Sequence, residues 1–143
     1  MLKLKIKDDS IKISFKGNVT GIIYLQYDNF IFPEENWNDF IVILLTDWSK
    51  KLINLASKGT SEEVFRFMDG PFFFHIYSLD KIHEIEFCHS NSTIKRVSFN
   101  FMSFVIEFIS VLNKIFPKIK NENINIKELD LINKNLKILQ KYI

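Results

Sequence analysis

The stretch from residue 62 to residue 101 alternates between apolar and polar residues in short runs separated by turn signals. Such alternation places the apolar side chains on one face of a β-strand. Asp69-Gly70 is a tight-turn dipeptide, and Ser90-Asn91-Ser92 is a second turn signal. The pattern predicts strands at residues 63–68, 72–77, 82–88 and 93–99. Consecutive strands joined by short turns pair antiparallel, and this constrains the fold more than any other feature of the chain.

A second group of strands is predicted nearer the N-terminus. Residues 11–15 alternate strictly, Gly17-Asn18 is a turn signal, and residues 21–27 form another apolar run. The two runs therefore read as a hairpin. Phe30-Ile31-Phe32 then leads into a loop that closes at Pro33.

The first predicted helix carries an apolar stripe at helical spacing. Asn36 is a capping residue, and Asp39 follows three positions later, where a carboxylate favours the positive end of a helix. Trp37 and Trp48 are eleven residues apart, about three helical turns, so both rings are expected on this stripe. Gly59 is the expected stop.

Two further helices are predicted in the C-terminal third. One runs from about Asn100 to Phe116 and is expected to end at Pro117. A polar link over residues 118–124 separates it from a helix that opens at Asn125 and carries a narrow apolar stripe.

The order of these elements predicts an α+β fold, because no strand alternates with a helix in the βαβ manner. We expect one antiparallel sheet of about six strands. A long helix follows the second strand, and two C-terminal helices pack on the sheet. A chain of 143 residues fits one domain, residues 1–143, and residues 125–143 are a helix that is alternatively a separate docking element.

The charge of +2 is unevenly distributed along the chain. Residues 1–16 carry a net +3, residues 17–90 a net −6, and residues 91–143 a net +5. An acidic middle segment favours a cationic partner. The chain has only two arginines and no basic stripe interleaved with aromatic residues, which disfavours nucleic acid as a partner.

No catalytic, cofactor-binding or metal-ligating motif is present in the sequence. The three histidines and the single cysteine do not form C-x-x-C, H-E-x-x-H or H-x-x-x-H, and the glycines do not form a phosphate-binding loop. We therefore predict no catalytic residue, no metal and no cofactor. One alternative stays open: His75 approaches Cys88 across the sheet, in a pocket that would suit a small enzyme or a ligand-binding domain.

The N-terminus gives no sign of an export signal. Its first seven residues alternate between apolar residues and lysine instead of forming an apolar run. The longest strictly apolar run, residues 40–45, is far shorter than the ~20 residues that cross a bilayer. We expect a cytoplasmic protein that does not act at a membrane.

Two segments of the chain carry a shared pattern: Phe32–Phe40, which contains a W-x-D-F sequence and is followed by Trp48, and Phe67–Phe73, which contains D-G-P. Together they resemble small bacterial proteins related to immunity proteins of polymorphic toxin and contact-dependent inhibition systems. The resemblance covers about residues 30–75. It implies an inhibitor that binds a cognate toxin domain, and it implies no catalytic residue.

The leading hypothesis is a non-enzymatic protein-binding protein, acting as an immunity protein that covers the active site of a toxin. Aromatic residues surrounded by carboxylates give such interfaces their affinity and fast encounter. A homodimer held by the C-terminal helix is a further alternative, so the chain is expected to be a monomer or a homodimer. The candidate partner-binding residues are Glu34, Glu35, Asp39, Asp69, Glu84 and Glu86.

Overall fold

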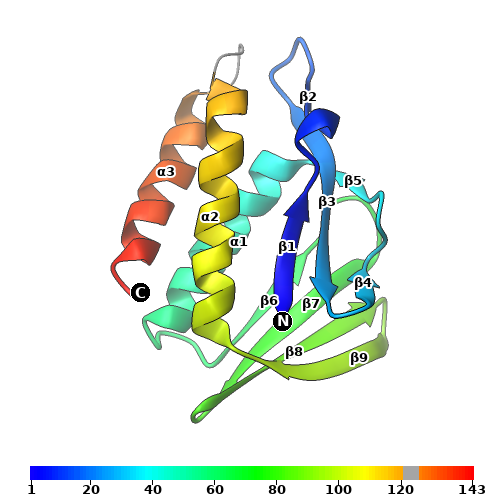
Figure 1. Ribbon diagram of the computed structural model, residues 1–143, viewed down its shortest axis with the longest axis vertical. Coiled ribbons are helices and arrows are strands. Elements are labelled where there is room, and N and C mark those ends of the chain that lie inside the picture. The colour runs from blue at the N-terminus through cyan, green and yellow to red at the C-terminus, as the bar shows by residue number, and fades with distance from the viewer. Residues whose placement is uncertain (121–125) are drawn as a thin grey trace.

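The computed structural model describes residues 1–120 and 126–143 and shows an α+β fold with two antiparallel sheets (Figure 1). The small sheet is built around the long strand β3, and the large sheet has the strand order β6-β7-β8-β9. The strands of the small sheet are β1 (Leu2–Ile6), β2 (Lys12–Ile13), β3 (Val19–Tyr27), β4 (Phe30–Phe32) and β5 (Asn38–Asp39). The large sheet contains β6 (Glu62–Arg66), β7 (Phe72–Leu79), β8 (Ile82–His89) and β9 (Ser92–Phe99).

Three helices complete the part of the chain that the structure describes. They are α1 (Ile41–Ala56), α2 (Phe101–Lys120) and α3 (Ile126–Gln140), and a single 3-10 turn covers Asp8–Ser10. Helix α2 lies beside β1, and α3 packs on α1 at the edge of the molecule (Figure 1). None of the helices in the described ranges is long and apolar enough to cross a membrane.

The predicted α+β class with antiparallel pairing is confirmed, but the single sheet of about six strands is replaced by two sheets. Strand β1 accounts for part of the difference. Leu2 and Leu4 are buried and Lys3 is exposed, so the alternation of the first residues marks a half-buried strand. The predicted strand over residues 11–15 contracts to Lys12–Ile13, and residues 38–39 form the short strand β5 on β3.

The helix boundaries also differ from the prediction. Helix α1 begins at Ile41 instead of Asn36, because Asn38 and Asp39 pair with β3, so Trp37 is not on the helical stripe. Helix α2 continues through Pro117 to Lys120. Pro117 and Asn113, whose carbonyl loses its usual donor, are both exposed, so water can replace the missing hydrogen bond. The predicted opening of the third helix at Asn125 lies outside the described residues.

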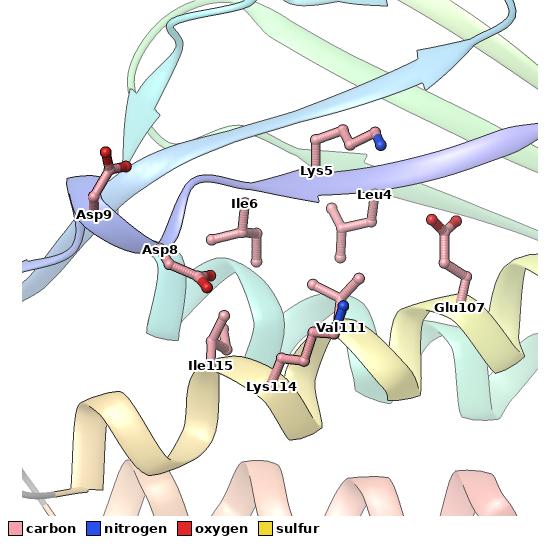
Figure 2. A pocket seen from close by; sticks show the side chains of 9 residues that line it. All are labelled: Leu4, Lys5, Ile6, Asp8, Asp9, Glu107, Val111, Lys114 and Ile115. Carbon is pink, nitrogen blue, oxygen red and sulfur yellow. The ribbon is translucent and has the colours of Figure 1, made fainter.

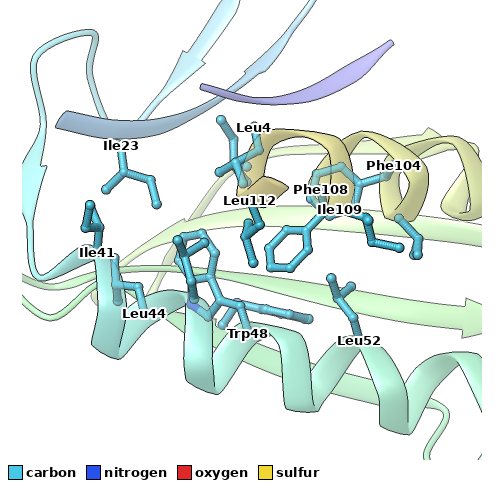
Figure 3. Packing of buried hydrophobic residues seen from close by; sticks show 14 of the residues in the cluster. Leu4, Ile23, Ile41, Leu44, Trp48, Leu52, Phe104, Phe108, Ile109 and Leu112 are labelled. Carbon is cyan, nitrogen blue, oxygen red and sulfur yellow. The ribbon is translucent and has the colours of Figure 1, made fainter. Parts of the chain in front are cut away.

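The core lies between α1, α2 and the inner faces of both sheets. Trp48 of α1 is fully buried near Phe108 and Leu112 of α2 and Ile23 of β3 (Figure 3). Rings from the two sheets also meet directly: the centroid of Phe32 lies 5.0 Å from that of Phe87 and 5.7 Å from that of Phe72. Buried aromatic area of this kind is a large share of the apolar surface removed from water.

Helix α1 covers one edge of the large sheet. The Nζ atom of Lys51 donates to the carbonyl oxygen of Val64 on β6, and the indole nitrogen of Trp48 donates to the carbonyl oxygen of Arg66 at 3.2 Å. These bonds occupy backbone acceptors that an edge strand would otherwise leave open. They fix the position of α1 along β6.

The apolar stripe of α3 packs on α1 of the same chain. Ile132, Leu136 and Leu139 are buried, and Nδ2 of Asn135 donates to Oγ of Ser49 on α1 at 3.0 Å. The residues that would form an intermolecular seam therefore contribute to the intramolecular core.

Candidate functional site

The buried carboxylate of Asp39 joins two loops that are thirty residues apart in sequence. Its Oδ2 atom accepts hydrogen bonds from the indole nitrogen of Trp37 at 2.9 Å and from the backbone N–H groups of Met68 at 3.0 Å and Asp69 at 3.2 Å. Its Oδ1 atom accepts from the backbone N–H of Phe40 at 2.7 Å. Four donors on one carboxylate fix the loop between β6 and β7 against the start of α1.

Close packing of Gly70 on Trp37 strengthens the same junction. Gly70 has a φ of +121°, and a Cβ atom placed on it would lie 3.0 Å from Cη2 of Trp37. The indole ring also packs edge-on against Phe67 and Phe72, at centroid distances of 6.0 and 5.2 Å. The W-x-D-F and D-G-P sequences therefore meet in space and hold each other in place.

Asp39 is predicted to lie on an acidic surface, but the structure places it in the interior. The residue is 1% exposed, and both carboxylate oxygens accept hydrogen bonds from the chain. It does not assist the dipole of α1 from an exposed first turn either, because the helix begins two residues later. The role that the structure supports for Asp39 is to position its neighbours.

An exposed surface lies around this junction. Glu34 and Glu35 are exposed in the turn between β4 and β5, and Asp69 is exposed in the loop after β6. Two apolar residues whose backbone N–H groups bind Asp39 are exposed as well, Phe40 at 38% and Met68 at 54%. We call Glu34, Glu35, Phe40, Met68 and Asp69 the turn surface.

Two members of the turn surface were missed by sequence reasoning. The helical spacing assigns Phe40 to the buried stripe of the first helix, and Met68 to a strand. Their exposure depends on the point at which α1 begins and on the position of the 67–71 loop. No local signal in the sequence marks either of these features.

Glu84 and Glu86 lie apart from the turn surface, on the outer face of the large sheet. Arg96 of the neighbouring strand donates to Oε1 of Glu84 through Nε at 2.9 Å and Nη2 at 2.8 Å, and its Nη1 lies 3.7 Å from Glu86. Its guanidinium also covers the ring of Tyr77 at 4.4 Å. The negative strip that these two glutamates would form is therefore compensated by Arg96.

His75 and Cys88 also lie on this outer face, on adjacent strands. His75 stacks on Tyr77 at a centroid distance of 4.0 Å, and its Nε2 lies 3.7 Å from Glu62. Cys88 is 4% exposed, and its Sγ lies 3.4 Å from Oε1 of Glu86. Burial, followed by the contact with Glu86, raises the pKa of the thiol to about 11. A thiol that is protonated at neutral pH is a poor nucleophile, so the surroundings of Cys88 do not activate it for attack.

A hollow of about 460 Å³ lies between β1 and α2 (Figure 2). Glu107 extends from α2 toward β1, where the backbone N–H of Leu4 donates to its carboxylate. One carboxylate oxygen is buried and has no hydrogen-bond partner among the described residues. Burial raises the pKa of Glu107, and Lys3 and Lys5 oppose that rise. No sequence motif marks Glu107.

No group of three or more histidine, cysteine, aspartate or glutamate side chains within residues 1–120 and 126–143 is arranged to hold a metal ion. The candidate residues other than Asp39 therefore divide between the exposed turn surface and the outer face of the large sheet, where Arg96 pairs with Glu84 and Glu86.

Comparison with known proteins gives no match: no family model fits the chain, and no curated protein or solved structure is significantly similar to it.

Proposed function

We propose that this chain is a non-enzymatic protein that binds a cationic protein partner through the turn surface. The observation that carries the proposal is the arrangement of Phe40 and Met68, which are exposed although their backbones are fixed by the buried carboxylate of Asp39. Exposed apolar side chains on a rigid backbone lose little entropy when a partner covers them. Such residues are typical of the centre of an interface.

The charges around the apolar pair support a cationic partner. Glu34, Glu35 and Asp69 are exposed in the two loops that Asp39 joins. Carboxylates at the rim of an interface accelerate the encounter with a positively charged surface, and salt weakens that effect. Glu84 and Glu86 are left out of the proposed interface because Arg96 compensates them.

The resemblance to immunity proteins suggests that the proposed partner is a toxin domain. On this reading the protein acts in the cytoplasm as an immunity protein and inhibits a toxin domain by covering its active site. The two sequences that carry the resemblance adjoin the turn surface: W-x-D-F supplies Phe40 and D-G-P supplies Asp69. An inhibitor that acts by steric cover needs complementary shape and charge and no catalytic residue of its own.

The test is association with the product of the gene that adjoins its own, first by co-purification and then by stopped-flow kinetics. In the double variant Glu34→Lys/Asp69→Lys, the association rate should fall at least tenfold at low salt and should depend less on ionic strength. Asp130→Lys, which reverses an exposed charge on α3, is the matched control and should leave the rate unchanged. Equal rates for all three proteins at low and high salt would exclude the turn surface as the interface.

A further inference from the structure

The turn between β2 and β3 presents a phenylalanine that lies outside the core. Phe15 is 95% exposed, whereas Ile11 and Ile13 just before it pack partly against the core. The ring of Phe15 is approached by its neighbour Lys16, whose Nζ lies 5.9 Å from the ring centroid. The apolar area of a whole phenyl ring is therefore open to a partner.

Hydrogen bonds hold the backbone of this turn in one conformation. The N–H of Ser14 donates to the carbonyl oxygen of Asn18 at 2.9 Å, and the N–H of Gly17 donates to the carbonyl oxygen of Ser14 at 2.9 Å. The N–H of Asn18 also donates to Oγ of Ser14 at 3.1 Å. Gly17 has a φ of +85°, the left-handed conformation that closes a short hairpin loop. An aromatic side chain on such a turn is presented without a further cost in backbone entropy.

The hairpin that carries Phe15 is cationic. Residues 10–27 contain Lys12 and Lys16 and no acid. Both lysines are exposed, and neither has a carboxylate partner among the described residues. The tip of the hairpin thus combines one exposed ring with two ammonium groups that are free to meet negative charge.

The turn lies at one end of the molecule, beside the C-terminal end of α2 (Figure 1). The 3-10 turn that precedes the hairpin carries the nearest acids in the sequence, Asp8 and Asp9. Asp8 pairs with Lys118 of α2 at 2.7 Å, which leaves the carboxylate of Asp9 as the uncompensated charge of that turn. The lysines of the hairpin therefore outnumber the free acids close to them in the chain.

We propose that the β2–β3 turn is a peripheral anchor for an anionic lipid surface. Phe15 enters the headgroup region, and Lys12 and Lys16 lie at the level of the phosphates. Aromatic rings insert at the boundary between headgroups and acyl chains, and lysines beside them are attracted by anionic lipids. The long stem of lysine lets its ammonium group stay at the surface while the ring lies deeper. This inference concerns a second surface and goes beyond the proposed function, and it replaces the expectation of a protein that does not act at a membrane.

The size and the charge of the tip favour a lipid surface over other occupants. One ring and two lysines form a contact much smaller than the roughly 1,000 Å² that a specific protein interface buries. A bilayer makes no demand on shape, so apolar insertion and electrostatic attraction both contribute from a small contact. A second copy of the chain is disfavoured because the joining of two tips would bring the lysines of both copies together.

The experiment is flotation of the full-length protein with vesicles of phosphatidylcholine and phosphatidylglycerol in equal parts, and with vesicles of phosphatidylcholine alone. The protein should float with the anionic vesicles, and salt should lower the bound fraction. Phe15→Ser should lower the partition coefficient about tenfold, as expected for loss of a large apolar side chain from the contact. Lys12→Gln/Lys16→Gln should lower it further, about fivefold for each lysine near an anionic surface.

Exposed residues away from the tip supply the matched controls. The turn between β7 and β8 lies at the opposite end of the molecule (Figure 1), and Ile82 beside it is 57% exposed. Ile82→Ser removes an exposed apolar side chain, and Lys58→Gln/Lys81→Gln removes two exposed lysines. Both controls should float as the wild type does. Melting of each variant, followed by circular dichroism, confirms that it is folded.

Insertion of the tip is measured separately from binding. Cys88 is the single cysteine of the chain and is buried, so Phe15→Cys places an accessible thiol at the tip for an environment-sensitive fluorescent dye. The emission of the dye should shift to shorter wavelength when anionic vesicles are added. The same dye on Ile82→Cys should show no shift.

Three results would overturn the inference. The first is equal flotation with anionic and neutral vesicles, because the lysines would then have no role. The second is flotation of Phe15→Ser at the level of the wild type, because another surface would then contact the lipid. The third is a wild-type protein that does not float, together with a loss of binding to the adjoining gene product in Phe15→Ser, because a protein would then be the occupant.

Discussion

The backbone N–H of Asp69 donates to the buried carboxylate of Asp39 at 3.2 Å, so an exposed acid is held in position by an interior one. Asp39 ends strand β5 and Asp69 lies in the loop between β6 and β7, thirty positions later in the sequence. Both are acidic, but only Asp69 is exposed to a partner. Asp39 is buried and fixes the backbone of Met68 and Asp69.

Replacement of Asp39 by asparagine should destabilise the fold. The amide retains one acceptor oxygen, while its NH₂ group faces N–H donors that now lack an acceptor. We expect the free energy of unfolding to fall by about 2 kcal/mol. Urea titration measures it, and Asp69→Asn, at an exposed position, should remain within about 0.5 kcal/mol of the wild type. Equal losses for both variants would contradict the structural role of Asp39.

Gly70→Ala should destabilise the same junction from the other side. The added Cβ would lie 3.0 Å from Cη2 of Trp37, and the φ of +121° is unfavourable for alanine. A loss of about 1–3 kcal/mol is expected.

Gly59→Ala is the matched control for this change, since its Cβ would meet nothing closer than 3.4 Å. Its free energy of unfolding should remain within about 0.5 kcal/mol of the wild type. The tryptophan emission of the native state, to which Trp37 and Trp48 both contribute, should shift for Gly70→Ala and not for Gly59→Ala. An unshifted, fully stable Gly70→Ala protein would show that the glycine is not in contact with the indole.

The sequence predicts the parts of the fold that have a local signature. Three of the large-sheet strands lie where alternation and turn dipeptides place them, since each pattern repeats over several residues. The start of α1 is mispredicted because Trp37 also fits the spacing of a helical stripe. The pairing of residues 38–39 with β3 is what delays the helix to Ile41. That pairing is a long-range contact, which no local periodicity encodes.

The candidate site is predictable to a smaller extent. Glu34, Glu35 and Asp69 are exposed as expected, because loops after turn signals face solvent. Asp39 is not, because its burial requires four donors from two separate loops. Arg96 pairs with Glu84 and Glu86, whereas Lys95 lies over the ring of Phe30, because the two side chains occupy different faces of β9.

The pairing of Arg96 with Glu84 should contribute modestly to stability. Both side chains are partly exposed, and exposed pairs of this kind contribute little to the free energy of unfolding. A double-mutant cycle with Arg96→Gln and Glu84→Gln measures the coupling without introducing a new charge. The coupling should weaken in 1 M salt, because the pair is accessible to solvent. A salt-independent coupling would mean that the stack of Arg96 on Tyr77 provides it instead.

The thiol of Cys88 should be slow to react in the folded protein. A rise in its pKa from 9.0 to about 11 lowers the thiolate fraction at pH 8 about a hundredfold, and burial reduces access further. Alkylation by iodoacetamide should therefore be at least that much slower in buffer than in urea at the same pH. Comparable rates in the two solvents would show that the outer face of the large sheet opens readily, and would revive Cys88 as a reactive group.

Glu107 should make the free energy of unfolding depend on pH in the acidic range. Burial raises the pKa of its carboxyl in the fold, so the folded state favours the neutral form. The stabilising contribution of this group is complete below the ordinary glutamate pKa of 4.5 and is lost as the pH rises through the higher pKa of the folded state.

Glu107→Gln stays neutral, and its amide oxygen can still accept from the N–H of Leu4. The variant should be more stable than the wild type at pH 7, and the difference should vanish toward pH 4. Urea titrations at both pH values measure it, with Glu35→Gln, at an exposed position, as the control. A Glu107→Gln protein that is less stable than the wild type at pH 7 would show that attraction to Lys3 and Lys5 outweighs the cost of burying the charge.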